Sequence, residues 1–348
     1  MSKQTVRIKD IAQYVGVSAS TVSAVLNQNG EQARISRETQ EKVFKAAKEL
    51  GYRKNISAKR LVEQHGSTPV IAIFWGAYAT ATNPLYFEYG MWSQFLCGTM
   101  AYMEDSGNRC ELCVQPFRVG QLEKCGELIY NSLYNGIIFV GISEADERYI
   151  ASIKIDVPFV IYNRSSTVFA SAEVNHYACG EMAAQLLLRT GVKNPAILST
   201  SEIRKSSSMR VVGFRDVCSK AGIPEGNIRS ISCGIEPEQI YRAIDQLMDG
   251  DVRPDGLFVN SGDIIVESVR RLNARGIKIP KQLRLVVFGT NPINELLTPP
   301  ITSVGAPVEK LAYDCMAMLL SSMQGQIKKG LTIIHEATYT CRESCPEV

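Results

Sequence analysis

The chain has 348 residues, of which 45% are hydrophobic and 21% are charged. These proportions exclude a disordered or fibrous protein, and the length suggests two or three domains. The longest stretch without a charged residue, 66–87, is interrupted by Asn83-Pro84, so the sequence predicts no membrane span. The first ten residues lack an apolar segment behind their positive charges, which predicts no signal peptide and a cytoplasmic protein.

Positive charge is concentrated at one end of the chain. Residues 1–65 contain 12 Lys and Arg against 6 Asp and Glu, whereas the remaining residues contain 26 basic and 29 acidic side chains. This asymmetry indicates a polyanion-binding head on a neutral-to-acidic body. On charge alone, a solvated charged segment without a partner is an equal alternative.

The sequence of the basic head, residues 1–65, predicts three short helices. Apolar residues at helical spacing predict a helix over 8–15 that ends at Gly16, and Ser18 is placed to cap a second helix over 19–26. A third helix is expected over 36–50. Two short helices joined by a turn containing glycine form a helix-turn-helix, whose second helix enters the DNA major groove. The polar face of that helix consists of Ser20, Thr21, Ser23 and Asn27.

The runs IKDIAQYVGVSASTVSAVLN and ISRETQEKVFKAAKELGYRKN resemble the DNA-binding headpiece of the lac-repressor-type transcriptional regulators. In that family the next segment forms a hinge helix on DNA, and a leucine opens the minor groove. The resemblance places Leu61 at this wedge, within a hinge over 55–62; the alternative is an ordinary linker leucine. Insertion of an apolar wedge unstacks a base step and bends the duplex. The residues expected at the DNA are Ser18, Ala19, Ser20, Thr21, Ser23, Asn27, Tyr52, Lys54, Asn55, Ala58, Lys59 and Leu61.

The head departs from the family pattern at several positions. Ala24 replaces a frequent arginine, and Ala19 and Ser20 are too short for the bidentate contacts that discriminate bases best. Specificity should therefore depend more on Ser20, Thr21, thymine methyl contacts and DNA bending. Lys54 stands where the family usually has proline and adds a charge that could face phosphate.

From Pro69 onward, short apolar runs alternate with helical patterns, and the same rhythm restarts after Val174. Such alternation predicts parallel sheets covered by helices, in two similar lobes. The fold class expected is an α-helical helix-turn-helix headpiece joined by a hinge helix to an α/β two-lobe core, similar to periplasmic binding proteins. The expected boundaries are 1–54 for the headpiece, 55–68 for the hinge helix and linker, and 69–348 for the core. Within the core, the first lobe is expected over 69–162 and 291–325, and the second over 163–290 and 326–342.

No motif for nucleotide, triphosphate or serine-hydrolase chemistry occurs in the sequence, so an enzyme is disfavoured and no cofactor is expected. The histidines, His65, His176 and His335, are far apart and are expected to be solvated or structural. The ten cysteines are expected to be reduced, because neither Cys110 with Cys113 nor Cys341 with Cys345 has spacing that suits a shared metal.

In two-lobe folds of this kind, ligands bind between the lobes, outside the carboxyl ends of the strands. The family's frequent acidic acceptors are missing, because Ser261-Gly262, Gly289-Thr290 and Asn175 replace them. If Arg164 has no protein carboxylate opposite it, it should favour an acidic or phosphorylated ligand over a neutral sugar. The alternatives are a structural ion pair for Arg164 and core packing for the aromatic residues. The residues expected at the effector are Tyr86, Phe87, Tyr162, Arg164, Ser261 and Gly289.

The sequence therefore predicts a cytoplasmic, homodimeric repressor that binds a near-palindromic DNA operator and responds to a small-molecule effector of unknown class. No leucine heptad follows the last expected strand, so no coiled-coil tetramer is expected. A regulator that ignores ligands is the main alternative. A solute-binding protein for transport is disfavoured by the basic head.

Overall fold

The computed structural model describes residues 8–26, 35–50, 68–77, 85–129, 134–164, 166, 168–201, 205–305, 307–326 and 330–346. The chain divides into two compact units, 1–67 and 68–348, each of which is described here by itself. Among the described residues, no helix is both long enough and apolar enough to cross a membrane.

The N-terminal unit contains the three predicted helices, α1 (Ile8–Val15), α2 (Ala19–Leu26) and α3 (Arg37–Glu49). Gly16 has a φ of +76°, so the chain turns sharply between α1 and α2 at a residue that tolerates this conformation. Ile11, Val22, Val25 and Val43 are almost completely buried and form the centre of the core. The predicted hinge residues lie outside the described part of the chain.

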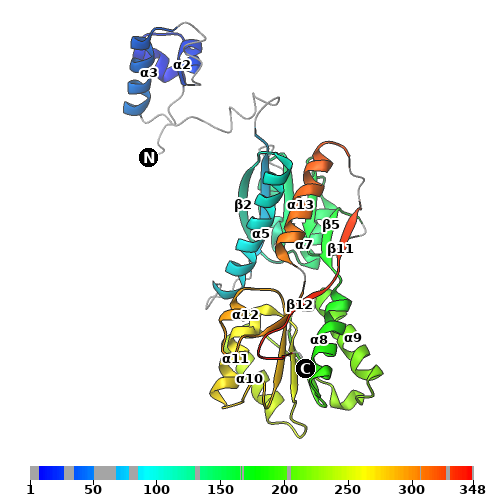
Figure 1. Cartoon of the computed structure of the whole chain (residues 1–348). Coiled ribbons are helices and arrows are strands. Elements are labelled where there is room, and N and C mark those ends of the chain that lie inside the picture. Colours follow the sequence, from blue (N-terminus) through cyan, green and yellow to red (C-terminus); the bar gives the residue numbers. More distant parts are fainter. Residues whose placement is uncertain are drawn as a thin grey trace. The chain divides into compact units, whose positions relative to one another are not determined.

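The second unit contains two six-stranded sheets, each flanked by helices (Figure 1). The first sheet has the order β11-β5-β4-β3-β1-β2, and all its pairs are parallel. Its strands are β1 (Val70–Ala77), β2 (Glu111–Arg118), β3 (Gly136–Val140), β4 (Phe159–Tyr162), β5 (Ser171–Val174) and β11 (Thr332–His335). The helices of this lobe are α5 (Leu85–Ser106), η1 (Leu122–Cys125), α6 (Gly126–Ile129), α7 (Glu144–Ser152) and α13 (Val308–Met323).

The second sheet has the order β12-β10-β9-β8-β6-β7, and β12 is the antiparallel strand. Its strands are β6 (Pro195–Thr200), β7 (Arg229–Cys233), β8 (Gly256–Val259), β9 (Arg284–Phe288), β10 (Thr302–Gly305) and β12 (Thr338–Thr340). The helices of this lobe are α8 (His176–Arg189), α9 (Lys205–Lys220), η2 (Glu225–Asn227), α10 (Pro237–Met248), η3 (Gly262–Ile264), α11 (Ile265–Ala274) and α12 (Ile293–Leu296).

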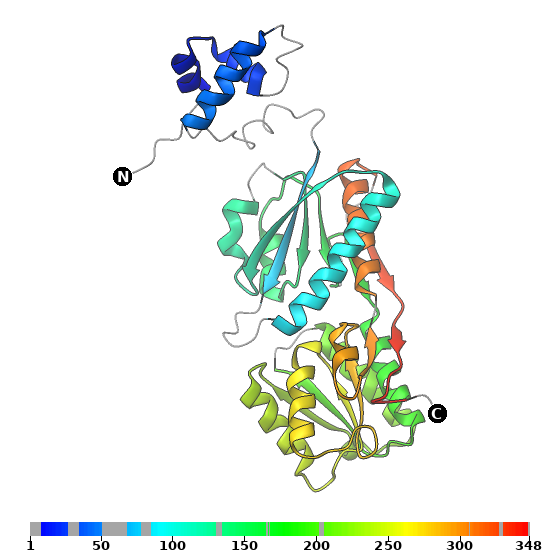
Figure 2. The ribbon, with the colours of Figure 1, turned by 60° about the vertical axis from the view of Figure 1, so that its left-hand side comes forward.

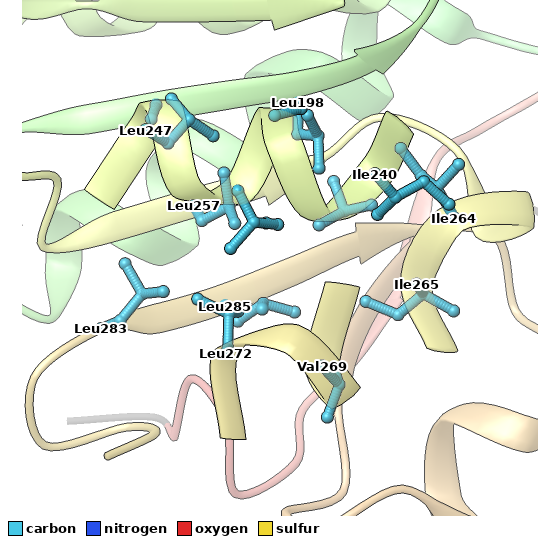
Figure 3. Close-up of a cluster of buried hydrophobic side chains, with 14 of the residues drawn as sticks. Leu198, Ile240, Leu247, Leu257, Ile264, Ile265, Val269, Leu272, Leu283 and Leu285 are labelled. Atoms are coloured by element: carbon cyan, nitrogen blue, oxygen red, sulfur yellow. The ribbon is translucent and has the colours of Figure 1, made fainter. Parts of the chain in front are cut away.

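The central strands of both sheets are continuously apolar because helices cover both faces. All five residues of β3 and all four of β8 are buried. On one side of the second sheet, Leu257 and Leu285 from the strands pack against Ile240 of α10 and Leu272 of α11 (Figure 3). On the first sheet, the long helices α5 and α13 lie side by side (Figure 2).

The chain passes between the lobes at places that differ from the predicted boundaries. Residues 163–174 were expected in the second lobe, but β5 pairs with β4 in the first sheet. Residues 291–305 were expected in the first lobe, but β10 pairs with β9 in the second. The C-terminal segment forms two strands, β11 and β12, one in each sheet. The sheet that each strand joins depends on pairing with strands that are distant in the sequence. The alternation of short apolar runs does not identify those partners.

Candidate functional site

Helix α2 presents a row of hydroxyl groups at its N-terminal end. The Ser18 Oγ accepts a hydrogen bond from the Thr21 backbone N–H at 3.0 Å, which caps the helix. The same oxygen lies 2.7 Å from the Ser20 Oγ and 2.7 Å from the Thr21 Oγ1. Val22 and Val25 anchor the opposite face in the core. The helix is therefore fixed by its apolar side and offers short donors and acceptors on the other.

The predicted DNA-facing residues of α2 differ in exposure. Ser18 and Ser20 are exposed, whereas Thr21 and Ser23 are half-buried. Ala19 packs partly against the headpiece core, which limits how much of its methyl group can meet a base. The remaining predicted residues lie outside the described part of the chain: Asn27, Tyr52, Lys54, Asn55, Ala58, Lys59 and Leu61.

In the second unit, a cavity of about 680 Å³ lies between the lobes. The first lobe contributes the ends of β3, β4 and β5 and one face of α7, and the second contributes the starts of α8 and α9. A smaller cavity of about 60 Å³ adjoins it and shares the lining residues Tyr162, Asn163 and Val174. Both lie where the carboxyl ends of parallel strands meet, the usual ligand position in such folds.

Arg164 lines the larger cavity but already has a protein carboxylate opposite it. Its Nε donates to the Glu147 Oε2 at 2.6 Å, and these side chains are only 17% and 25% exposed. The expectation of an uncompensated guanidinium is therefore wrong, because α7 places Glu147 beside the end of β4. The inference of an acidic or phosphorylated ligand, which depended on that expectation, loses its basis.

The structure places the other predicted effector residues at different points. Tyr162 is buried, borders both cavities and packs its ring against Phe95, and burial raises the pKa of its hydroxyl well above the ordinary value. Gly289 borders the smaller cavity with a φ of +111°. Ser261 lines neither cavity, and its Oγ instead accepts from the Asp263 N–H at the start of η3. The side chains of Tyr86 and Phe87, on α5, lie outside the described part of the chain.

A buried polar network adjoins the cavity. The Arg210 Nε donates to the Asn260 Oδ1 at 2.6 Å, and Nη2 donates to the Asn260 carbonyl at 3.0 Å. Nη1 lies 3.0 Å from the His176 Nδ1, and the guanidinium carbon lies 3.6 Å from the ring centroid of Phe288. Burial, and then the nearby Arg210 charge, lower the pKa of His176 to about 3. The imidazole is therefore neutral at ordinary pH.

The sequence pattern did not predict this network of Arg210, Asn260 and His176. Arg210 lies in the run Met209-Arg210-Val211-Val212-Gly213-Phe214, and Asn260 immediately precedes the predicted Ser261. One signal was present, because an arginine within such an apolar run must find buried partners. The partners come from β8, α8 and β9, so their identity could not be read from local sequence.

The charges that line the larger cavity balance. Its acidic residues are Glu144, Glu147 and Glu173, and its basic residues are Arg148, Arg164 and Lys205. With His176 neutral, the formal charge of this lining is zero. The described lining residues themselves therefore carry no net charge, although the Arg210 guanidinium lies 3.0 Å from His176.

Comparisons with known proteins support the division into two functional parts. Residues 7–55 match the family described as bacterial regulatory proteins, lacI family, and residues 184–345 match the periplasmic binding protein-like domain. The HTH-type transcriptional regulator DegA of Bacillus subtilis is 25% identical over 342 residues, which cover 97% of each chain. The chain thus joins a DNA-binding domain of the lacI family to a periplasmic binding protein-like domain. Another relative, the HTH-type transcriptional repressor PurR of Histophilus somni, is 23% identical over 92% of this chain and 93% of its own.

Solved structures share the fold of this chain. The lac repressor dimer bound to operator and the anti-inducer ONPF superimposes with a TM-score of 0.71 at 20% identity, over 99% of this chain and all of the other. The transcriptional regulator CelR in complex with cellobiose superimposes with a TM-score of 0.68 at 21% identity, over 97% and 99%. The fold of this chain is thus that of these two regulators.

Proposed function

We propose that this lacI-family regulator is a homodimeric repressor whose operator affinity is set by an uncharged small molecule bound between its lobes. The proposal rests on one observation, that a single chain contains both DNA-binding and ligand-binding features. It has a helix-turn-helix with exposed hydroxyl groups at α2, and a two-lobe unit with an interlobe cavity. A DNA-binding role places the protein in the cytoplasm, and nothing in the proposal requires catalysis.

In this proposal α2 lies in the major groove, and residues 55–68 form the hinge and linker. The row formed by Ser18, Ser20 and Thr21 contacts bases and phosphates, and Leu61 wedges the minor groove. The relatives provide support, because one of the superimposed structures is a dimer bound to its operator and another is a sugar complex. A dimer binds two half-sites, so the operator should be a near-palindrome with a flexible pyrimidine-purine step at its centre.

A regulator that ignores ligands is the second candidate. It is favoured by the internal pairing at the cavity, where Arg164 is neutralised by Glu147 and Arg210 is held by Asn260. Polar side chains that satisfy one another can serve structure alone.

Genome-wide footprinting with the full chain tests the proposal. We expect discrete near-palindromic sites whose affinity falls steeply with salt, because basic residues displace counterions from phosphate. Binding that is uniform along DNA, or that does not respond to salt, would contradict it. Repeating the footprint with candidate sugars separates the ligand-responsive repressor from the ligand-independent one.

A further inference from the structure

Three hydroxyl groups at the start of α2 meet at one oxygen. The Ser18 Oγ accepts from the Thr21 backbone N–H at 3.0 Å and lies 2.7 Å from both the Ser20 Oγ and the Thr21 Oγ1. A serine hydroxyl has one proton to donate and two lone pairs that accept. Because the Thr21 N–H occupies one lone pair of Ser18, only one of the two neighbouring hydroxyls can donate to this oxygen. Ser18 then donates its own proton to the other.

The three hydroxyls therefore form a hydrogen-bonded chain that has a direction. In one direction Thr21 donates to Ser18 and Ser18 donates to Ser20, which leaves the Ser20 proton free. In the other direction Ser20 donates to Ser18 and Ser18 donates to Thr21, which leaves the Thr21 proton free. Both directions keep the same two hydrogen bonds, so the surroundings of the free proton decide between them.

The exposure of the two ends favours the first direction. Ser20 is exposed, whereas Thr21 is half-buried. Within the described part of the chain, neither hydroxyl has a hydrogen-bond partner other than Ser18. A free proton on Ser20 is met by water or by DNA, but a free proton on Thr21 is partly shielded from both, and a shielded donor without an acceptor costs free energy. Hydrogen bonds in a chain also polarise one another, which strengthens the donor at the Ser20 end.

We propose that Thr21 is a positioning residue that, through Ser18, holds the Ser20 hydroxyl as a donor toward DNA, so that Ser20 selects a base edge that carries an acceptor. This inference rests on the proposed function, which places α2 in the major groove. Guanine presents two acceptors in that groove and thymine presents one, whereas cytosine presents a donor. A serine outside such a chain donates or accepts equally well and discriminates little between these edges. Here a donor edge forces the chain to reverse and leaves the Thr21 proton unpaired.

Binding of the full chain to every single-base variant of a footprinted half-site tests the inference. The base position at which Ser20→Ala changes the preference is the position that Ser20 reads. At that position we expect the wild type to bind guanine or thymine about fivefold more tightly than cytosine, and Ser20→Ala to lose this preference. A cytosine preference there would overturn the inference. So would a Ser20→Ala variant that changes no position, because Ser20 would then contact only the DNA backbone or nothing.

Substitutions at Thr21 distinguish the hydroxyl chain from simple packing. Thr21→Val keeps the shape of the side chain and the capping N–H but removes the hydroxyl, so that Ser18 and Ser20 can donate to each other in either direction. Thr21→Ser keeps the hydroxyl and is the matched control. We expect Thr21→Val to reduce the base preference at the Ser20 position from about fivefold to less than about twofold, and Thr21→Ser to retain it. A preference that survives unchanged in Thr21→Val would refute the positioning role.

The readout does not depend on how stable each variant is. The preference is a ratio of two affinities measured on the same protein, so a smaller folded fraction of the headpiece lowers both affinities and cancels from the ratio. An equal loss of affinity for all four bases in Thr21→Val, with the ratio kept, would therefore show a purely structural role and overturn the inference. If the wild type protects no discrete site, the proposed function fails as well. If it protects discrete sites whose base preferences ignore Ser20 and Thr21, only the hydroxyl chain fails.

Discussion

The proposed DNA-facing surface of the headpiece and the interlobe cavity are built in opposite ways. Ser18, which caps α2, and Ser20 and Thr21 in the first turn of α2 are neighbours in sequence. At the cavity, Arg210 is held by Asn260, fifty positions later, and by His176, thirty-four positions earlier. The first surface needs only a helix with one buried side, whereas the Arg210 network needs several elements of the folded second lobe.

This contrast predicts different costs for changes in the two regions. An exposed hydroxyl on α2 can be removed without exposing a core or leaving a buried charge. The Arg210 network has the opposite property, because each member satisfies a buried partner and the loss of one member leaves the others unsatisfied. Substitutions should therefore affect DNA binding with little loss of stability in the headpiece, and should affect stability strongly at the lobe crossing.

The largest effect is expected for Arg210→Ala. Arg210 is 5% exposed, and its loss leaves Asn260 and His176 without their donor, so the free energy of unfolding of the second unit should fall by about 3 kcal/mol. Urea unfolding measures this change. The matched control is Arg215→Ala on the same helix, where the partner Glu225 is 72% exposed and the expected loss is under about 1 kcal/mol. Equal losses in the two variants would contradict a special role for the buried network.

The three headpiece helices could be predicted from the sequence because local signals define them. Ser18 caps a helix over the predicted range, Gly16 makes the turn, and an apolar face forms the core. The alternation of strands and helices likewise predicted the two lobes. It could not assign β5, β10 or β11 to a sheet, because such assignment depends on pairing with distant strands.

The effector residues were harder to predict for the same reason. Arg164 was expected to face a ligand, but Glu147 comes from a helix seventeen positions earlier, and only the folded first lobe brings the two side chains together. Ser261 was chosen where the neighbouring Asn260 reaches Arg210. Of the predicted effector residues, Tyr162 and Arg164 line the larger cavity and Gly289 lines the smaller one, whereas the partners of each side chain follow only from the tertiary structure.

Acid should weaken the second unit through His176. Its pKa is about 3 in the folded chain against an ordinary value of 6.5, so below pH 6.5 the unfolded chain binds a proton that the folded chain does not. This contribution is fully present above pH 6.5 and is lost as the pH falls toward 3. By pH about 5 the loss should be about 2 kcal/mol, measured by urea unfolding. His176→Gln should lose less stability over the same interval, and identical pH profiles would show that His176 is not buried in its neutral form.

A substitution in the proposed hinge tests whether a residue outside the headpiece can act through DNA shape and not through protein stability. Leu61→Ala should weaken operator binding by about 1 to 3 kcal/mol and leave binding to random DNA nearly unchanged, since only the bent specific complex uses the wedge. Fluorescence anisotropy with both DNAs measures the difference. Val62→Ala provides a neighbouring control of similar chemistry. An equal loss on random DNA would leave Leu61 as an ordinary packing residue.

The smallest expected effect distinguishes two roles of Ser18 in the headpiece, helix capping and DNA contact. Ser18→Ala removes the acceptor for the Thr21 N–H, and Ser36→Ala removes the equivalent acceptor for the Thr39 N–H at the start of α3. Each change should lower headpiece stability by about 1 kcal/mol, measured by thermal unfolding. Only Ser18→Ala also disturbs the hydroxyl row of α2, because the Ser18 Oγ lies within 2.7 Å of the Ser20 and Thr21 hydroxyls. Operator affinity, measured well below the unfolding temperature, should therefore fall for Ser18→Ala and stay close to wild type for Ser36→Ala. If the two variants lose affinity equally, α2 contributes to binding only through the stability of the headpiece, and the DNA-facing surface must be sought on another element.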